Sequence, residues 1–388
     1  MADVNLRWNG VDLDEIFLKT NEEYLLPTHL NPGILYSTGA NETGQLGLND
    51  IVTRSSPVQV GTNKNWVEVA SGNNHSYFLK SDRTLWGCGY NAFYQLGNLA
   101  SFINASSPIQ IATTGGYLTS IKEIKTNGNT ACAITLDGAL WTWGQEKNGT
   151  SGQNIAFAGG GQVTPGQVGT SWSTADIYFH GLAVKTNGTL WSWGENLVGE
   201  LGQNNRTNRS SPVQVGTDTN WKKVFTGFTT SYAIKTDGSL WSWGDNIYGS
   251  LGQNIASTVK RSSPVQIGTS TDWKEISTNQ YAVCALKTNG TLWVWGLNDF
   301  GQLGLNNTTL ISSPVQLGGL TNWYKVSCST YGVLAIKTDG TLWGWGGAAA
   351  GMLGTNDIII RSSPIQIGTL TNWRSVGVGD NQSVLLTY

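Results

Sequence analysis

The stretch KTNGTLWSWGENLVGELGQNNRTNRSSPVQVG, residues Lys185–Gly216, occurs in near copies along the whole chain of 388 residues. Its clearest landmark is a leucine followed by an aromatic residue, and successive leucines of this pair lie 50, 55, 50, 50, 52 and 50 residues apart. The seven pairs are Leu35-Tyr36, Leu85-Trp86, Leu140-Trp141, Leu190-Trp191, Leu240-Trp241, Leu292-Trp293 and Leu342-Trp343. Seven copies at a nearly constant period indicate a tandem-repeat architecture.

Each repeat carries the same turn signals. An apolar run such as SYAIK (Ser231–Lys235) is followed by Thr-Asp-Gly or Thr-Asn-Gly and then by a second apolar run with a Trp-x-Trp motif. This order is a strong hairpin signal, because Asn-Gly and Asp-Gly readily adopt the positive φ angles that a two-residue turn requires. A glycine-rich loop, a third run of the form SSPVQVG and a fourth run such as NWKKV complete the repeat. The pattern therefore predicts four antiparallel strands per repeat.

The prolines indicate which strand lies at the edge. Seven of the nine prolines occupy one repeat position, two residues before the glutamine of the third run: Pro57, Pro108, Pro165, Pro212, Pro264, Pro314 and Pro364. Proline cannot donate a hydrogen bond to a neighbouring strand, so it is confined to edge strands or strand starts. We therefore expect this strand to be the outermost one of each sheet.

The arrangement predicts an all-β fold, a seven-bladed β-propeller of four-stranded antiparallel blades. An open solenoid is the alternative for any tandem repeat. The two ends of the chain favour the ring, because each end holds half a repeat. We expect Trp373–Val378 and Ser383–Thr387 to form one blade with Ile34–Ser37 and Pro57–Val60, which would close the ring.

Composition narrows the functional classes. Only 12% of the residues are charged, the formal net charge is −2, and no block of lysine or arginine is present, so a nucleic-acid partner is not expected. The first residues lack the features of a signal peptide, and no apolar stretch is long enough to span a bilayer. We expect a protein that does not insert into membranes and that resides in the cytoplasm or, if it is a phage component, in a virion assembled there.

The residues that often carry chemistry have structural explanations here. Both tryptophans of the Trp-x-Trp motif recur in nearly every repeat, so we expect them to pack between sheets rather than to stack on a carbohydrate. Cys88, Cys132 and Cys284 fall inside apolar runs and are expected in the core, and none of the four cysteines has zinc-site spacing. His29, His75 and His180 lie in contexts that look unrelated. We expect no catalytic residue, no metal and no cofactor.

The stretch NGTLWVWGLNDFGQLGLN (Asn289–Asn306) resembles the regulator-of-chromosome-condensation repeat, which reads roughly DGxLWxWGxNxxGQLGxG. The resemblance covers about residues 31–388 and implies a propeller. The family includes a nuclear exchange factor for the Ran GTPase, domains of ubiquitin ligases and a bacterial inhibitor of β-lactamases. These functions share little beyond protein binding, so the resemblance implies a fold rather than an activity.

The segments between Trp-Gly and Ser-Ser-Pro vary most from repeat to repeat, and the blade geometry places all of them on one face of the disc. Their large apolar residues form a candidate protein-binding rim, although tolerated loop variation is the simpler explanation for any one of them. The candidate residues are Phe93, Tyr94, Phe102, Ile103, Phe157, Tyr248, Phe300, Ile358, Ile359 and Ile360.

Residues 1–30 belong to no repeat, and we expect them to form an attachment segment that precedes the propeller of residues 31–388. The stretch WNGVDLDEIF (Trp8–Phe17) resembles the openings of virion structural proteins of tailed bacteriophages. The apolar residues expected to anchor the segment are Trp8, Val11, Leu13, Ile16 and Phe17.

Three functional hypotheses follow. The first is a non-enzymatic virion protein of a tail fibre, baseplate or decoration, which contacts neighbouring virion subunits or a host surface receptor. The second is a soluble regulator that binds a GTPase or an enzyme through the loop face. The third is a glycan-degrading enzyme or lectin. A glycosidase needs two facing carboxylates, whereas Glu195, Asp245 and Asp299 fall in different repeats, so we do not expect an enzyme.

Overall fold

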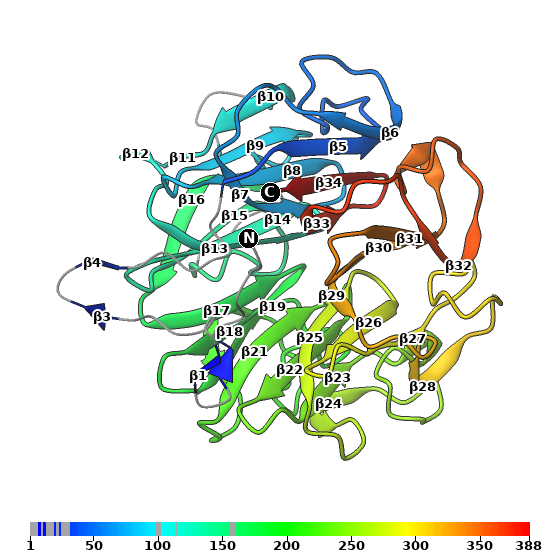
Figure 1. Cartoon of the computed structure of the whole chain (residues 1–388). Helices are drawn as coiled ribbons and strands as arrows, with labels where there is room; N and C mark the ends of the chain where they lie inside the picture. The colour runs from blue at the N-terminus through cyan, green and yellow to red at the C-terminus, as the bar shows by residue number, and fades with distance from the viewer. Residues whose placement is uncertain are drawn as a thin grey trace.

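The computed structural model describes residues 32–97, 102–113, 115–154 and 160–388, together with four short strands near the N-terminus. These strands form two hairpins, β1 (Arg7–Trp8) with β2 (Val11–Asp12) and β3 (Lys19–Thr20) with β4 (Glu23–Tyr24). In the described part of the chain, seven four-stranded antiparallel sheets surround a common axis as a β-propeller (Figure 1). The predicted fold class is confirmed.

Each blade is numbered by its place in the ring, and its strands are given from the axis outward. Blade 1 consists of β33 (Trp373–Val378), β34 (Gln382–Thr387), β5 (Leu35–Gly39) and β6 (Arg54–Gln59). Blade 2 consists of β7 (Trp66–Ser71), β8 (His75–Lys80), β9 (Leu85–Gly89) and β10 (Ala105–Gln110). Blade 3 consists of β13 (Ile121–Asn127), β14 (Thr130–Thr135), β15 (Leu140–Glu146) and β16 (Gly160–Gly169). A hairpin of β11 (Ala112–Thr113) and β12 (Gly116–Tyr117) lies between blades 2 and 3 in sequence.

The remaining four blades follow the same order along the chain. Blade 4 consists of β17 (Trp172–Ile177), β18 (His180–Lys185), β19 (Leu190–Gly194) and β20 (Arg209–Gln214). Blade 5 consists of β21 (Trp221–Thr226), β22 (Thr230–Lys235), β23 (Leu240–Gly244) and β24 (Arg261–Gln266). Blade 6 consists of β25 (Trp273–Thr278), β26 (Ala282–Lys287), β27 (Leu292–Gly296) and β28 (Ile311–Gln316). Blade 7 consists of β29 (Trp323–Cys328), β30 (Gly332–Lys337), β31 (Leu342–Gly346) and β32 (Arg361–Gln366). The proline-bearing strand is outermost in every blade, as predicted.

Blade 1 closes the ring with strands from both ends of the chain. The C-terminal strand β34 pairs with β5, with Leu386 opposite Leu35 and Ser383 opposite Thr38. The Thr387 N–H donates to the Ile34 carbonyl at 3.1 Å. In Figure 1 the red β33 and β34 accordingly lie beside the blue β5 and β6. The predicted shared blade is confirmed, and the solenoid alternative is wrong.

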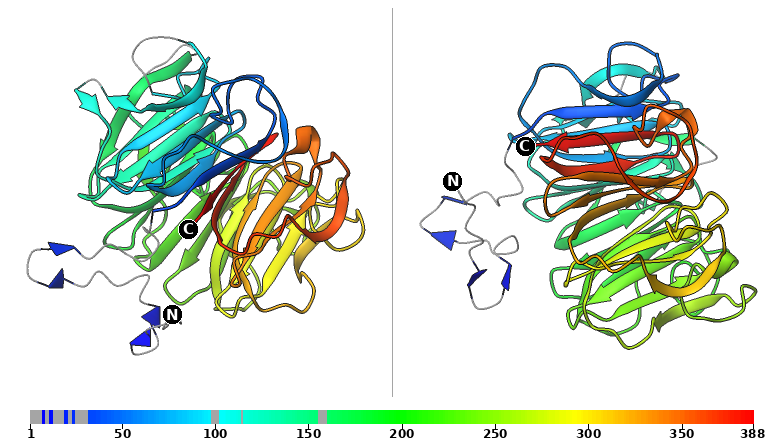
Figure 2. Two further views of the ribbon diagram at one scale, coloured as in Figure 1. Left: turned by 45° about the horizontal axis from the view of Figure 1, so that its top comes forward. Right: turned by 45° about the vertical axis from the view of Figure 1, so that its right-hand side comes forward.

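The two faces of the disc carry different connections. The loops between the first and second strands and between the third and fourth strands of each blade emerge on one side, which we call the loop face. The Asn-Gly and Asp-Gly hairpins and the connections between blades lie on the other side, the turn face, where β34 ends at the C-terminus (Figure 2). Gly188 shows why these hairpins need glycine, since its φ is +80° and a Cβ there would lie 2.0 Å from the Thr219 carbonyl oxygen.

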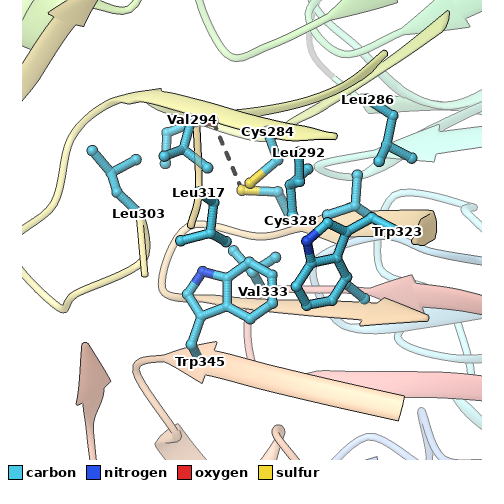
Figure 3. Packing of buried hydrophobic residues seen from close by; sticks show 13 residues of the cluster. Cys284, Leu286, Leu292, Val294, Leu303, Leu317, Trp323, Cys328, Val333 and Trp345 are labelled. Carbon is cyan, nitrogen blue, oxygen red and sulfur yellow. Dashed lines mark hydrogen bonds between the residues drawn. The ribbon is translucent and has the colours of Figure 1, made fainter. Parts of the chain in front are cut away.

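The core consists of seven apolar layers between neighbouring blades. The second tryptophan of the Trp-x-Trp motif lies at the centre of five of them and is at most 2% exposed: Trp143, Trp193, Trp243, Trp295 and Trp345. Each indole N–H donates to a carbonyl of the preceding blade, as Trp345 does to Gln302 at 2.9 Å. Figure 3 shows the layer between blades 6 and 7, where Cys284 and Cys328 face each other beside Leu317. The expected core positions of Cys88, Cys132 and Cys284 are confirmed.

The first tryptophan of the motif lies in a different environment. Trp241 and Trp293, for example, are only partly buried, near the circumference of the disc. A lysine lies over each of these rings and also over the tryptophan that begins the innermost strand of the same blade. Lys287, for example, lies 4.5 Å from the ring centre of Trp293 and 4.6 Å from that of Trp273. Both tryptophans thus pack against the layers between blades, as expected, but only the second is fully buried. The lysines also cover ring faces that a sugar would need for stacking.

Glu200 occupies a position where three other blades have glutamine. Its Oε2 accepts the Val198 N–H at 2.9 Å, and Gln302 Oε1 accepts the Phe300 N–H in the same way at 2.8 Å. Glu200 is only 2% exposed, and this burial raises the pKa of its carboxyl to about 7. The loop therefore requires a hydrogen-bond acceptor at this position but does not require a negative charge.

We expect Glu200→Gln to stabilise the protein at pH 8. An acid whose pKa is higher in the folded state destabilises that state once it ionises, so the variant should gain up to about 3 kcal/mol above pH 7. This gain should fall to about 1 kcal/mol near pH 5, because the folded wild-type carboxyl is then protonated. Urea unfolding of both proteins at the two pH values measures the effect. An equal gain at both pH values would contradict the explanation.

Candidate protein-binding face

The central channel is too small to be a ligand site. Its polar cavity has a volume of about 120 Å³, whereas pockets for small molecules usually exceed about 300 Å³. Charges of both signs line it, including Glu68, Lys125 and Glu275. Burial acts to lower the pKa of Lys125, but the surrounding carboxylates, Glu123 foremost, raise it above its usual value. Burial outweighs these attractions at two of the carboxyls, because it raises the pKa of Glu68 and brings that of Asp176 to about 6.

The most distinctive feature of the loop face is a group of five aromatic residues on blades 4, 5 and 6. Phe228 lies at the centre, with its ring 5.5 Å from Tyr178, 5.4 Å from Phe179 and 6.2 Å from Tyr281. Tyr281 in turn lies 5.1 Å from Tyr248, and the contacts are edge-to-face. We call these five residues the aromatic cluster. Tyr178 is buried, while the other four are half-buried and form a continuous apolar surface across three blades.

Loops of two kinds contribute to the cluster. Tyr178, Phe179, Phe228 and Tyr281 lie in the short loops between the first and second strands, and Tyr248 lies in the 3-10 turn η3 (Ile247–Gly249) between β23 and β24. Of these five residues, only Tyr248 was predicted from the sequence. The other four lie one or two residues before the second strand of successive repeats, and an aromatic residue at this place in each of these repeats is the signal that would have identified them.

The predicted rim is only partly assembled. Tyr248 joins the aromatic cluster, and Phe300 pairs with Tyr331 of blade 7 at 5.2 Å. Phe93 and Tyr94 are half-buried, Tyr94 against Phe102 at 4.6 Å. The strongly exposed candidates lie apart from these residues, Phe102 and Ile103 on blade 2 and Ile358–Ile360 on blade 7. Phe157 lies outside the described residues.

Ion pairs border the aromatic cluster. Lys147 lies 4.5 Å from the Phe179 ring centre and 3.0 Å from Glu195 Oε2, and Lys260 lies 3.4 Å from Asp245 Oδ2. An apolar centre with a polar margin is typical of protein-binding surfaces. Glu195 and Asp245, considered above as glycosidase carboxylates, thus each pair with a lysine, and Asp299 is exposed.

His75 and His180 are not in unrelated contexts, contrary to the expectation. Each is the first residue of the second strand of its blade, and each bonds through Nε2 to a hydroxyl of the next blade, Thr126 at 2.9 Å and Ser231 at 2.7 Å. Both are fully buried, and burial lowers the pKa of each to about 3. They are neutral hydrogen-bonding residues of the core at physiological pH.

Two further features bear on the sequence-based expectations. In the described part of the chain, no three His, Cys, Asp or Glu side chains gather into a group that could hold a metal ion. The described helical segments include no helix long and apolar enough to cross a membrane.

Of the expected anchoring residues, Leu13, Ile16 and Phe17 lie outside the described residues, and for Trp8 and Val11 only the backbone strands are described.

Hollows of ligand size occur at the seams between blades on the circumference. Two of them, of about 420 and 410 Å³, contain the tryptophan pair with its covering lysine, Lys287 in one and Lys337 in the other. A third, of about 400 Å³, lies at the seam between blades 7 and 1. It contains Tyr36 and Trp373 and no lysine.

The chain is similar in sequence to one family model and to several known proteins. The family model described as "RCC1-like domain" matches residues 34–385. The chain is 29% identical over 126 residues to the ultraviolet-B receptor UVR8 of Arabidopsis thaliana, and 31% identical over 121 residues to an RCC1-like G exchanging factor-like protein of Homo sapiens. These alignments cover 32% and 29% of this chain but 28% and 25% of the relatives, so the chain matches about a quarter of each relative's length.

The fold also matches solved structures. Prp20p from Saccharomyces cerevisiae superposes with a TM-score of 0.80 at 20% sequence identity, and the match covers 92% of this chain and 91% of that one. At this identity the likeness shows a shared fold.

Proposed function

Because the chain belongs to the family of RCC1-like domains, we propose that it is a non-enzymatic regulator that binds a GTPase or an enzyme through its loop face. The observation that carries this proposal is the aromatic cluster. Four half-buried rings lie side by side on a face where no further blade covers them. Aromatic residues are enriched at the centres of protein interfaces and supply much of the binding energy there.

The names of the relatives support this hypothesis over the virion hypothesis. The human relative is named as a G exchanging factor-like protein, and the yeast structure was described together with the binding of Prp20p to Gsp1p and histones. These partners are properties of those proteins. For this chain they favour a protein partner and make a GTPase the first candidate to test.

The virion hypothesis depends on Trp8–Phe17, which lie outside the family match of residues 34–385. It stays a prediction, as does the associated location in a phage particle. Mass spectrometry of purified particles would test it, and absence of the protein from them would end it.

We expect Phe228→Ala combined with Tyr281→Ala to weaken partner binding strongly. Truncating one central aromatic residue of an interface costs about 2 kcal/mol or more, so the double variant should bind at least about 30-fold more weakly. The test uses the purified full chain and a panel of small GTPases loaded with a fluorescent guanine nucleotide. Interferometry measures binding, and fluorescence measures nucleotide release.

The control is Tyr117→Ala, since Tyr117 is an aromatic residue 62% exposed in the β11–β12 hairpin of the turn face. This variant should bind like the wild type. Unchanged binding by the double variant would show that the aromatic cluster is not the contact. Failure of every GTPase in the panel would reject the GTPase form of the proposal and leave an enzyme partner to be tested in the same way.

A further inference from the structure

Two loops on the outer margin of the loop face share one rigid geometry. In blade 1, Asp50 Oδ1 accepts the Val52 N–H at 2.9 Å, and Asp50 Oδ2 pairs with Arg54 at 2.6 Å. In blade 7, Asp357 accepts the Ile359 N–H at 3.2 Å and pairs with Arg361 at 2.7 Å. Each arginine also donates to the carbonyl of the residue that the aspartate holds, at 2.7 Å in both loops. The residues between aspartate and arginine are therefore fixed in place.

These loops display large apolar side chains to solvent. Together with the equivalent loop of blade 2 they form what we call the apolar arc: Ile51 (65% exposed), Val52 (57%), Phe102 (61%), Ile103 (71%), Ile358 (70%), Ile359 (60%) and Ile360 (55%). Backbone bonds join the three loops, from Asn356 N–H to the Ser55 carbonyl and from Asn49 N–H to the Ser106 carbonyl, both at 2.7 Å. The arc thus runs over three adjacent blades, at the circumference where β32, β6 and β10 begin (Figure 1).

The fold does not require apolar residues at these positions. The loops of blades 4 and 6 form the same turn, in which Asn205 accepts the Thr207 N–H at 3.0 Å and Asn307 accepts the Thr309 N–H at 2.9 Å. Threonine therefore occupies the positions that Val52 and Ile359 occupy in blades 1 and 7. The apolar character is concentrated on one side of the ring, although the backbone turn is the same on both sides and Leu310 of blade 6 is 42% exposed.

The size of the arc suits a stable interface. Seven large side chains that are each more than half exposed present on the order of 700 Å² of apolar surface, at about 100 Å² each. The largest apolar patch on an ordinary monomer is about 300–600 Å². A standard interface takes about 800 Å² from each partner. The aspartate–arginine pairs neutralise the charges beside the arc, so a partner surface needs no net charge.

An apolar hollow adjoins the arc. The seam hollow of about 400 Å³ between blades 7 and 1 begins at Asn356 and Arg361, next to the isoleucines of blade 7, and is lined by Tyr36, Pro57 and Leu370. The comparable hollows between blades 5 and 6 and between blades 6 and 7 each hold a lysine. One surface thus carries a protruding apolar loop and an apolar hollow side by side, which is the combination that a two-fold contact between identical chains requires.

We propose that the apolar arc is the contact for a second copy of this chain, in a two-fold dimer. The Ile358–Ile360 loop of each protomer enters the seam hollow of the other, and Ile51 and Val52 pack beside it. Blades 4, 5 and 6 lie outside this contact, so the aromatic cluster stays free in both protomers. The dimer does not depend on the function proposed above.

Sedimentation velocity of the full chain between 1 and 100 μM tests the proposal. The wild type should sediment as a species with twice the mass of the monomer, which is 41.7 kDa. Val52→Asp combined with Ile359→Asp places a charge on each loop at the contact, and the dimer dissociation constant should rise at least 100-fold. Both residues are exposed in the monomer, so the two substitutions should leave the fold intact. The thermal midpoint of the variant, measured at 1 μM, checks this.

The matched control is Thr207→Asp combined with Thr309→Asp, which introduces the same charges at the same turn position on blades 4 and 6. This variant should remain dimeric. A wild-type chain that is monomeric at 100 μM would overturn the proposal. A dimer that survives Val52→Asp with Ile359→Asp, or that dissociates equally in the control, would also overturn it.

Discussion

Replacing Trp243 with alanine should destabilise the propeller by about 3–5 kcal/mol, the range observed for large aromatic residues removed from a core. The side chain is fully buried between blades 4 and 5, against Leu182, Val184 and Val215. Its indole N–H also donates to the Glu200 carbonyl at 2.7 Å. Alanine would leave a cavity at the seam and remove a hydrogen bond between two blades.

The matched variant is Trp241→Ala, two residues away on the same strand. Trp241 is only partly buried, and its ring faces Lys235 at 4.1 Å. Its loss should cost about 1–2 kcal/mol, mostly in partial burial and the cation–π contact. Urea unfolding followed by circular dichroism measures both variants. Equal costs would contradict the assignment of different roles to the two tryptophans.

Removing the two C-terminal strands should abolish cooperative folding. A chain that ends at Leu370 lacks β33 and β34, and with them six buried apolar side chains: Trp373, Val376, Val378, Val384, Leu385 and Leu386. At about 1.5–3 kcal/mol each, their burial contributes on the order of 10 kcal/mol. This is comparable with the whole stability of an ordinary protein. Blade 1 would also be left with two strands, which are marginal in isolation.

A circular permutant tests whether folding requires a closed ring or requires the chain termini at their natural position in blade 1. Joining Tyr388 to Gly33 by a short turn and opening the chain between Asp237 and Gly238 keeps every propeller strand. Since Thr387 and Ile34 are already hydrogen-bonded, the permutant should unfold cooperatively with a thermal midpoint close to that of the wild type. Calorimetry compares the two proteins. A truncated chain that melts cooperatively at the wild-type temperature would show that blade 1 does not lock the ring.

The repeat made the fold predictable. Hairpin turns, prolines and incomplete terminal repeats are local signals, and together they determined the strand order, the outer strands and the closing blade. The burial of each side chain was less predictable, because it depends on which residues of the neighbouring blade lie opposite that side chain. Trp241 and Trp243 project from the same side of their strand, yet only Trp243 is covered by the loop of the preceding blade.

The candidate face was predicted only in part for a related reason. Variation between repeats drew attention to the long loops of Tyr248 and Phe300. The short loops of Phe179, Phe228 and Tyr281 looked like ordinary connections, and only the three-dimensional arrangement shows that both kinds of loop meet on one face. The shared environment of His75 and His180 was missed similarly, because their flanking residues differ while their place in the blade is the same.

Closure through blade 1 brings Gly33 and the C-terminus together on the turn face, opposite the aromatic cluster. A tag, reporter or surface linker attached at Tyr388 would therefore leave the loop face unobstructed. A protein immobilised through that end would present its aromatic residues uniformly to a partner in solution.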